Sequence, residues 1–234
     1  MQEKIQPKRL LAVGDIHGFL DKLQGLMEQV RPTLEDKVIF LGDYIDRGPD
    51  SKGVIEYLID FRKRFPQTVF LRGNHEQMLL DAMVEDREAQ ARLMLDLPRN
   101  TETLYYSDFI ANGGQATLDS YGATFDDIPA EHTAFMEACP YWHREVATVR
   151  NNNYGTRSQE FIFVHAGIRP GIPLENQDTD DLLWIRDEFL TSEEDFGGAI
   201  VVHGHTFDYE EAPVIRPNRI GMDGTYGPAY LALF

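Results

Sequence analysis

The chain has 234 residues, of which 42% are hydrophobic and 26% are charged, as in ordinary soluble globular proteins. This length fits a single α/β domain with a substantial core. The formal net charge of −17 and the pI near 4.7 argue against DNA, RNA or an anionic membrane as the main partner, because those surfaces bind proteins rich in lysine and arginine.

Cysteine content and the N-terminus indicate the compartment. Cys139 is the only cysteine, which excludes intrachain disulfides and thiolate metal clusters and favours a buried, inert thiol. The first ten residues, MQEKIQPKRL, lack the apolar core of a signal peptide, and no apolar run approaches the length of a membrane span. We therefore expect a cytoplasmic protein.

Strands and helices are expected to alternate in the first third of the chain. Apolar runs predict strands at 10–13, 38–41 and 68–71, and helical spacing predicts helices at about 19–30 and 51–65, with a third helix starting near Glu76. This order describes two successive right-handed βαβ units, which favours a parallel sheet.

The pattern changes from about 84 to 158, where the sequence is helical and rich in loops. We interpret this segment as a cap insertion over one end of the sheet within a single domain, 1–234. After it we expect a strand at 160–164, a helix at 181–190, a strand at 199–202 and a terminal strand in AYLALF.

Polar side chains follow each of five predicted strands at the point where the strand ends. They are Asp15 and His17; Asp43, Asp46 and Arg47; Arg72, Asn74 and His75; His165; and His203 and His205. Ordinary turns also contain such residues, but turns alone would not place them after the same end of every strand. Ligands of α/β proteins collect outside the carboxyl ends of the strands, so the pattern predicts one shared site.

Six of these side chains offer oxygen or nitrogen ligands without sulfur: Asp15, His17, Asp43, Asn74, His165 and His205. This set suits Mn, Fe or Zn, and it exceeds the needs of one tetrahedral ion. Two divalent ions that share Asp43 are the economical arrangement. Such a pair acidifies bound water towards a pKa of ~7 and stabilises both oxygens of an in-line displacement.

Arginines and an acid pair would complete a phosphate site. Arg47 and Arg72 lie within a few residues of the ligands, and a guanidinium group matches phosphate oxygens. Arg186 could join them or could be an exposed helix arginine. His75 could protonate a leaving oxygen with Asp46 orienting its ring, although Asp46 could instead be a turn residue.

Five motifs strongly resemble the calcineurin-like metallophosphoesterases, and within them the phosphoprotein phosphatase branch of bacterial serine/threonine phosphatases. They are GDIHG at 14–18, GDYIDRG at 42–48, RGNHE at 72–76, HAG at 165–167 and GHT at 204–206. The resemblance implies an α/β fold in which a two-sheet β sandwich is flanked by helices, with antiparallel strands that our parallel-sheet interpretation lacks.

Carried over by position, the family pattern assigns the site residues. One metal would bind Asp15, His17 and Asp43, and the other Asp43, Asn74, His165 and His205. Arg47, Arg72 and Arg186 would bind phosphate, with His75 and Asp46 as the acid pair.

Some positions depart from relatives outside this branch. Those relatives often place a second ligating histidine after the GH motif, where this chain has Phe207, which favours the phosphoprotein phosphatase branch. HAG and WIRDEF resemble bacterial members. No family role transfers to His203, which we interpret as supporting the ligands or the fold, and Tyr226 lies roughly where relatives have a site tyrosine.

The resemblance implies a metal-dependent phosphomonoester hydrolase, a protein serine/threonine phosphatase in which a hydroxide activated by two divalent ions, preferably Mn, attacks phosphorus directly. The substrate would be a phosphorylated protein or a small phosphoester, and no particular oligomeric state is favoured. The alternatives are a symmetrical diadenosine tetraphosphate hydrolase and a non-catalytic module that binds phosphorylated ligands.

The 84–158 insertion should distinguish the two hydrolases, with a base-stacking pocket in a dinucleotidase and an open groove in a protein phosphatase. Its aromatic residues could serve either role or belong to the core: Tyr105, Tyr106, Tyr121, Tyr141 and Trp142.

Overall fold

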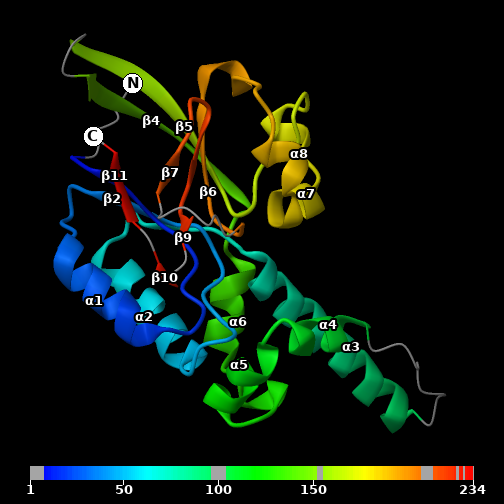
Figure 1. The fold of residues 1–234 in the computed structure, drawn as a ribbon. Helices are drawn as coiled ribbons and strands as arrows, with labels where there is room; N and C mark the ends of the chain where they lie inside the picture. The colour runs from blue at the N-terminus through cyan, green and yellow to red at the C-terminus, as the bar shows by residue number, and fades with distance from the viewer. Residues whose placement is uncertain are drawn as a thin grey trace, which may run out of the picture.

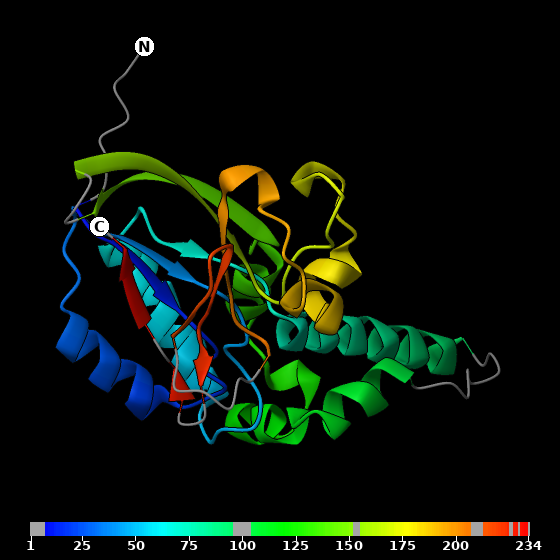
Figure 2. The ribbon, with the colours of Figure 1, turned by 45° about the horizontal axis from the view of Figure 1, so that its top comes forward.

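The computed structural model describes residues 8–95, 104–151, 155–206, 213–224, 227–228 and 230–233. Two β-sheets lie face to face, and helices cover the outer face of each sheet (Figures 1 and 2). The expected sandwich of two sheets flanked by helices is therefore confirmed.

The first sheet has the strand order β11-β1-β2-β3. Its strands are β1 (Leu10–Val13), β2 (Lys37–Phe40), β3 (Val69–Phe70) and β11 (Tyr230–Leu233). β1, β2 and β3 are parallel, as the βαβ pattern predicted, and β11 joins β1 in the antiparallel direction.

The second sheet has the order β4-β5-β6-β8-β7. Its strands are β4 (Trp142–Asn151), β5 (Gly155–Val164), β6 (Ile200–His203), β7 (Val214–Ile215) and β8 (Arg219–Gly221). β5, β6 and β8 are parallel, whereas β4 and β7 are antiparallel to their neighbours. β9 (Asp223–Gly224) and β10 (Gly227–Pro228) form a separate small pair.

The helices fall into three groups along the chain. The first comprises α1 (Leu20–Val30), α2 (Ser51–Arg64) and α3 (Asn74–Met94), the second α4 (Leu104–Ala111), α5 (Gly114–Tyr121) and α6 (Ala130–Glu137), and the third α7 (Thr179–Trp184) and α8 (Asp187–Leu190). Short 3-10 turns occur at Phe125–Asp127, Leu174–Asn176 and Phe196–Gly198. Figure 1 shows α3 and α4 extending together away from the sheets.

Several elements differ from the sequence-based expectation, among them the short strands β7 to β10, which we did not predict. The segment 84–158 contains the helices α4, α5 and α6 but also β4, a further strand that we did not predict, and the start of β5. The helix expected at 181–190 is broken at Ile185 and Arg186, whose backbone leaves the helical region. This break places Arg186 at the start of α8 instead of within a continuous helix.

The apolar strands are buried on both faces, which explains their unbroken hydrophobic runs. In β1, Leu11 and Val13 pack with the helices α1 and α2, while Leu10 and Ala12 face the second sheet. In β5, Phe161 and Phe163 fill the space between the sheets. Among the described helices, none is both long enough and apolar enough to cross a bilayer.

Candidate active site

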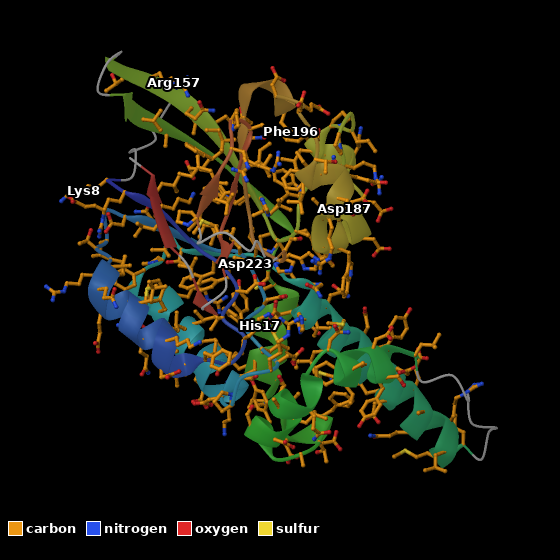
Figure 3. All side chains as sticks on the ribbon, in the orientation of Figure 1. Lys8, His17, Arg157, Asp187, Phe196 and Asp223 are labelled. Atoms are coloured by element: carbon orange, nitrogen blue, oxygen red, sulfur yellow. The ribbon has the colours of Figure 1, made fainter. Side chains whose placement is uncertain are left out.

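The candidate site lies where the carboxyl ends of strands from both sheets meet. The loops after β1, β2, β3, β5 and β6 bring their polar side chains to this edge, which the labels of His17 and Asp223 mark in Figure 3. Two clusters of potential metal ligands form there, His17 with Asp43 and His75, and Asp43 with His165 and His205. Asp43 belongs to both clusters.

The loop after β2 is held in place by the buried carboxylate of Glu76 on α3. One oxygen of this carboxylate accepts the backbone N–H groups of Tyr44 at 2.7 Å and Ile45 at 3.4 Å, and the other accepts those of Asp43 and Gly73 at 2.9 Å each. Burial and the nearby charge of Asp43 raise the pKa of Glu76 to about 7. Glu76 thus fixes the backbone that carries Asp43.

Two glycines allow the loops after β2 and β3 to approach each other. Gly42 has a φ of +107°, and a Cβ atom there would lie 2.5 Å from the nitrogen of Gly73. A Cβ atom on Gly73 would lie 2.1 Å from Oδ1 of Asp43. A larger residue at Gly42 would therefore push the two loops apart, and one at Gly73 would displace the shared carboxylate.

Left-handed backbone is concentrated at the site. Eight non-glycine residues of the described chain have positive φ, and five of them belong to the site: His17, Asp43, Asp46, Arg47 and His205. Such conformations cost of order 1–3 kcal/mol each when the residue is not glycine, and they persist only where the surroundings enforce them.

The two carboxylate oxygens of Asp43 face different partners. Oδ1 lies 3.4 Å from Nε2 of His165, whereas Oδ2 lies 3.7 Å from Nε2 of His17 and 3.7 Å from Nε2 of His75. Burial acts to raise the pKa of Asp43, but the surrounding imidazoles lower it well below its ordinary value. A carboxylate in this position is suited to bridging two cations.

Asn74, His165 and His205 converge beside Oδ1 of Asp43. The side-chain oxygen of Asn74 lies 2.8 Å from Nε2 of His165 and 3.0 Å from Nδ1 of His205. Nδ1 of His165 lies 2.9 Å from the carbonyl oxygen of Leu41, which orients the ring so that Nε2 faces Asn74 and Asp43. An amide oxygen, a carboxylate oxygen and two imidazoles therefore meet at one point.

Asp15 and His17 lie on the side of the site that Oδ2 of Asp43 faces. Oδ2 of Asp15 lies 3.8 Å from Nε2 of His17, and His17 donates its Nδ1–H to the carbonyl of Ile45 at 3.0 Å. Behind them Asp223 accepts the backbone N–H of Asp15 at 3.2 Å. Burial, followed by the charges of Asp223 and Asp43, raises the pKa of Asp15 well above its ordinary value.

This donor set fits divalent metal ions. Oδ1 of Asp15 and Nε2 of His205 are buried and have no hydrogen-bond partner among the residues that the structure describes. Burial lowers the pKa of His17 to about 4 and that of His205 to about 2, which keeps both imidazoles in the neutral form that binds metals. Buried polar atoms without a hydrogen-bond partner are ones that a cation would satisfy.

His75 and Asp46 form a buried pair. His75 donates its Nδ1–H to Oδ2 of Asp46 at 2.6 Å. Burial acts to lower the pKa of His75, but the carboxylates of Asp43 and Asp46 outweigh it, and the pKa is raised. The pair can hold and deliver a proton beside the ligand cluster.

The three predicted phosphate-binding arginines differ in position. The guanidinium of Arg47 lies against the site, with its nitrogens 2.8 Å from Nε2 of His17 and 3.0 Å from Nε2 of His75. Arg72 instead donates to Gln77 at 2.9 Å and Tyr141 at 3.0 Å, as well as to a backbone carbonyl.

Arg186 lies at the exposed margin of the site. It donates to the hydroxyl of Thr206 at 3.3 Å, next to His205. The ring of Trp184 meets His205 edge-on at 5.8 Å between centroids.

The remaining sequence-based candidates lie apart or cannot be placed. His203 is buried, packs edge-on against Phe189 at 5.0 Å and belongs to neither ligand cluster. Phe207 and Tyr226 lie outside the described residues.

Four residues near the site received no role from the sequence: Ser51, Glu76, Thr117 and Asp223. Glu76 closes the RGNHE motif and Asp223 opens DGTYGP, so motif context could have indicated both. Thr117 is 71 residues from Asp46, which it contacts, and no local pattern indicates it.

Comparisons with known proteins agree with this geometry. A family model described as calcineurin-like phosphoesterase matches residues 8–222. Serine/threonine-protein phosphatase 1 of Salmonella typhimurium is 41% identical over 132 residues, which cover 56% of this chain and 47% of that protein. The chain thus spans about half the length of this relative.

Solved structures share the fold. A protein proposed to be a diadenosine tetraphosphatase has a TM-score of 0.58 at 21% identity, over 99% of this chain and 91% of that chain. The cold-active protein-tyrosine phosphatase of a psychrophilic Shewanella species has a TM-score of 0.52 at 15% identity, over 93% of this chain and 71% of that chain.

Proposed function

Because the chain belongs to the calcineurin-like phosphoesterase family, we propose that it is a metal-dependent phosphomonoesterase that removes phosphate from phosphoserine or phosphothreonine in proteins. The observation that supports this most is the position of Asp43, whose two oxygens face separate groups of imidazoles. A single ion would need only one of these oxygens.

Two divalent ions, with Mn first and Fe or Zn as alternatives, would be held by the donors described above. Asp15, His17 and Asp43 would bind one ion, and Asp43, Asn74, His165 and His205 the other. When bound, the ions would acidify water and stabilise negative charge on phosphoryl oxygens.

The side chains of the protein would bind and orient the substrate. Arg47 is placed to hold phosphate oxygens with its planar fork, and Arg72 and Arg186 would extend this grip from the margins. Arg47 lies 3.0 Å from Nε2 of His75 and would move from it to the phosphate when substrate binds. His75 would then protonate the departing oxygen from Nε2, while Asp46 fixes its ring through Nδ1.

Two aromatic residues of the insertion, Tyr121 and Tyr141, are engaged within the protein, which supports a protein substrate over a dinucleotide. Tyr121 is buried and its hydroxyl lies 2.8 Å from Nδ1 of His132, Tyr106 packs edge-on against Phe125, and Tyr141 hydrogen-bonds Arg72. Tyr105 and Tyr106 are 56% and 41% exposed, so the comparison of substrates below tests whether this surface stacks on a nucleobase.

The acidic charge of −17 supports a partner other than nucleic acid, and the lone cysteine supports a reducing compartment, so we propose a cytoplasmic location. A non-catalytic binding module would not require unprotonated donors to converge on one point.

The deciding experiment compares catalytic efficiency on a phosphoserine peptide, a phosphotyrosine peptide and diadenosine tetraphosphate, with Mn present. The proposal expects the phosphoserine peptide to be preferred and excess chelator to abolish turnover. Preference for the dinucleotide would assign the alternative hydrolase, and full activity in chelator would contradict metal dependence.

A further inference from the structure

A buried hydroxyl group of helix α5 contacts the pair formed by His75 and Asp46. The hydroxyl of Thr117 donates to Oδ1 of Asp46 at 2.6 Å, while Oδ2 of the same carboxylate accepts from His75 at 2.6 Å. Thr117 and Asp46 are both completely buried. The two oxygens of Asp46 are thus held by different helices, Oδ1 by Thr117 of α5 and Oδ2 by His75 of α3.

The backbone of Asp46 is held by the same hydroxyl groups. Its N–H is shared between the hydroxyl oxygens of Thr117 at 2.9 Å and Ser51 at 3.0 Å. The two hydroxyls lie 2.9 Å apart. Since the Thr117 hydrogen goes to Asp46, the Ser51 hydroxyl must donate to Thr117, and every hydrogen of this network has an acceptor.

The rest of α5 is anchored around this contact. The carbonyl of Gly113 accepts the backbone N–H of Arg47 at 3.2 Å, and the hydroxyl of Ser120 accepts that of Lys52 at 3.2 Å. Thr117 lies between these two anchors on the helix. The left-handed backbone of Asp46, with a φ of +72°, therefore depends on contacts from a segment distant in sequence.

We propose that Thr117 is a positioning residue for proton donation, which orients Asp46 and, through it, the ring of His75. This inference rests on the proposed phosphomonoesterase function and on the acid role of His75. Without the Thr117 hydroxyl, Oδ1 of Asp46 would lose its buried partner, and the carboxylate could rotate away from the geometry that aims Nε2 of His75 at the leaving oxygen.

The test uses the dependence of the rate on the leaving group. Thr117→Val, Thr117→Ser and wild type are assayed with Mn on phenyl phosphate, whose leaving group needs protonation, and on 4-nitrophenyl phosphate, whose leaving group does not. For Thr117→Val we expect kcat on phenyl phosphate to fall about tenfold or more, part of the ~10²–10⁴ that an acid can contribute. In the same variant, kcat on 4-nitrophenyl phosphate should fall far less, and KM should be unchanged for both esters. Thr117→Ser should retain most of the wild-type kcat on phenyl phosphate.

Thr133→Val is the matched control. Thr133 is a largely buried threonine of α6 whose hydroxyl donates to the carbonyl of Ala130 at 3.1 Å, away from Asp46. Its substitution should leave the ratio of the two rates at the wild-type value. An equal loss on both esters in Thr117→Val, or the same selectivity in Thr133→Val, would overturn the inference.

A second readout does not depend on turnover. The short hydrogen bond between His75 and Asp46 should give a strongly downfield proton resonance, assigned by its loss in His75→Asn. We expect Thr117→Val to shift or broaden this resonance and Thr117→Ser to retain it. An unchanged resonance in Thr117→Val would overturn the positioning role, whereas wild-type protein inactive on every ester with Mn would overturn the proposed function instead.

Discussion

The carboxylate of Glu76 accepts the backbone N–H of Asp43 at 2.9 Å, so a side chain at the start of α3 fixes the residue that joins the two ligand clusters. The two residues are 33 positions apart, and both are buried. The position of Asp43 therefore depends on a tertiary contact, and this contact can be tested by measuring stability instead of activity.

We expect Glu76→Gln to destabilise the protein by about 2 kcal/mol, because the amide NH₂ group would face backbone donors that now have an acceptor. Unfolding in urea, with and without Mn, would measure this change. Glu88→Gln, at an exposed position on the same helix, is the control and should leave the free energy of unfolding unchanged. Equal stability of Glu76→Gln and wild type would refute the role of Glu76.

Removal of the shared carboxylate should affect both ions. Titration calorimetry should find about two Mn ions per chain in wild type and almost none in Asp43→Ala, because each ion would lose a ligand. His205→Ala should weaken only one of the two ions. The exposed Asp126→Ala is the control, and two tightly bound ions in Asp43→Ala would contradict a bridging role.

Replacement of the proposed acid should slow the chemical step. In His75→Asn we expect kcat on a phosphoserine peptide to fall about 10²-fold with little change in KM, since the leaving oxygen would depart unprotonated. Metal content should remain at two ions. Loss of one ion would instead identify His75 as a ligand, which its distance of 3.7 Å from Oδ2 of Asp43 permits.

The ion pair between Lys37 of β2 and Glu145 of β4 joins the two sheets and should give a pH-dependent contribution to stability. Burial acts to raise the pKa of Glu145, but Lys37 and His143 outweigh it and lower the pKa below the ordinary 4.5. A depressed folded-state pKa stabilises the protein above the ordinary pKa, and this contribution is lost as the pH falls through the folded-state value.

Glu145→Gln should consequently be less stable than wild type at neutral pH, and the difference should shrink in acid. Urea unfolding at neutral pH and below the ordinary pKa of glutamate measures both quantities. A difference that stays constant, or grows, as the pH falls would show that another interaction is responsible.

The sequence predicted the parallel strands and the ligand-bearing loops because both leave local signals. Buried parallel strands appear as unbroken apolar runs, and polar residues directly after them mark the carboxyl ends, where ligands collect. That these strands belong to two sheets followed only from the family resemblance. β4 was missed because its sequence, WHREVATVRN, has neither an unbroken apolar run nor a regular alternation of apolar and polar residues; it is stabilised mainly by pairing with β5, and strand propensity depends strongly on such context.

Residues that support the site were harder to predict than its ligands. Asp15, Asp43, Asn74, His165 and His205 each closely follow a strand within one of the motifs, and this position is visible in the sequence. Thr117 contacts Asp46 only because α5 packs on the start of α2, and this packing has no signature in either segment. The redirection of Arg72 towards Tyr141 likewise depends on a loop that local sequence does not specify.

The left-handed backbone of the site limits how the protein can be made more robust. At Ala123 a change to glycine would relax an unfavourable conformation without removing a hydrogen-bonding or metal-binding side chain. The same change at Asp43 or His205 would relax the chain equally but erase the side chain for which the conformation exists. Substitutions that raise thermal stability should therefore be sought outside the site, because the strained loops of the site lower stability in return for the orientation of their ligand side chains.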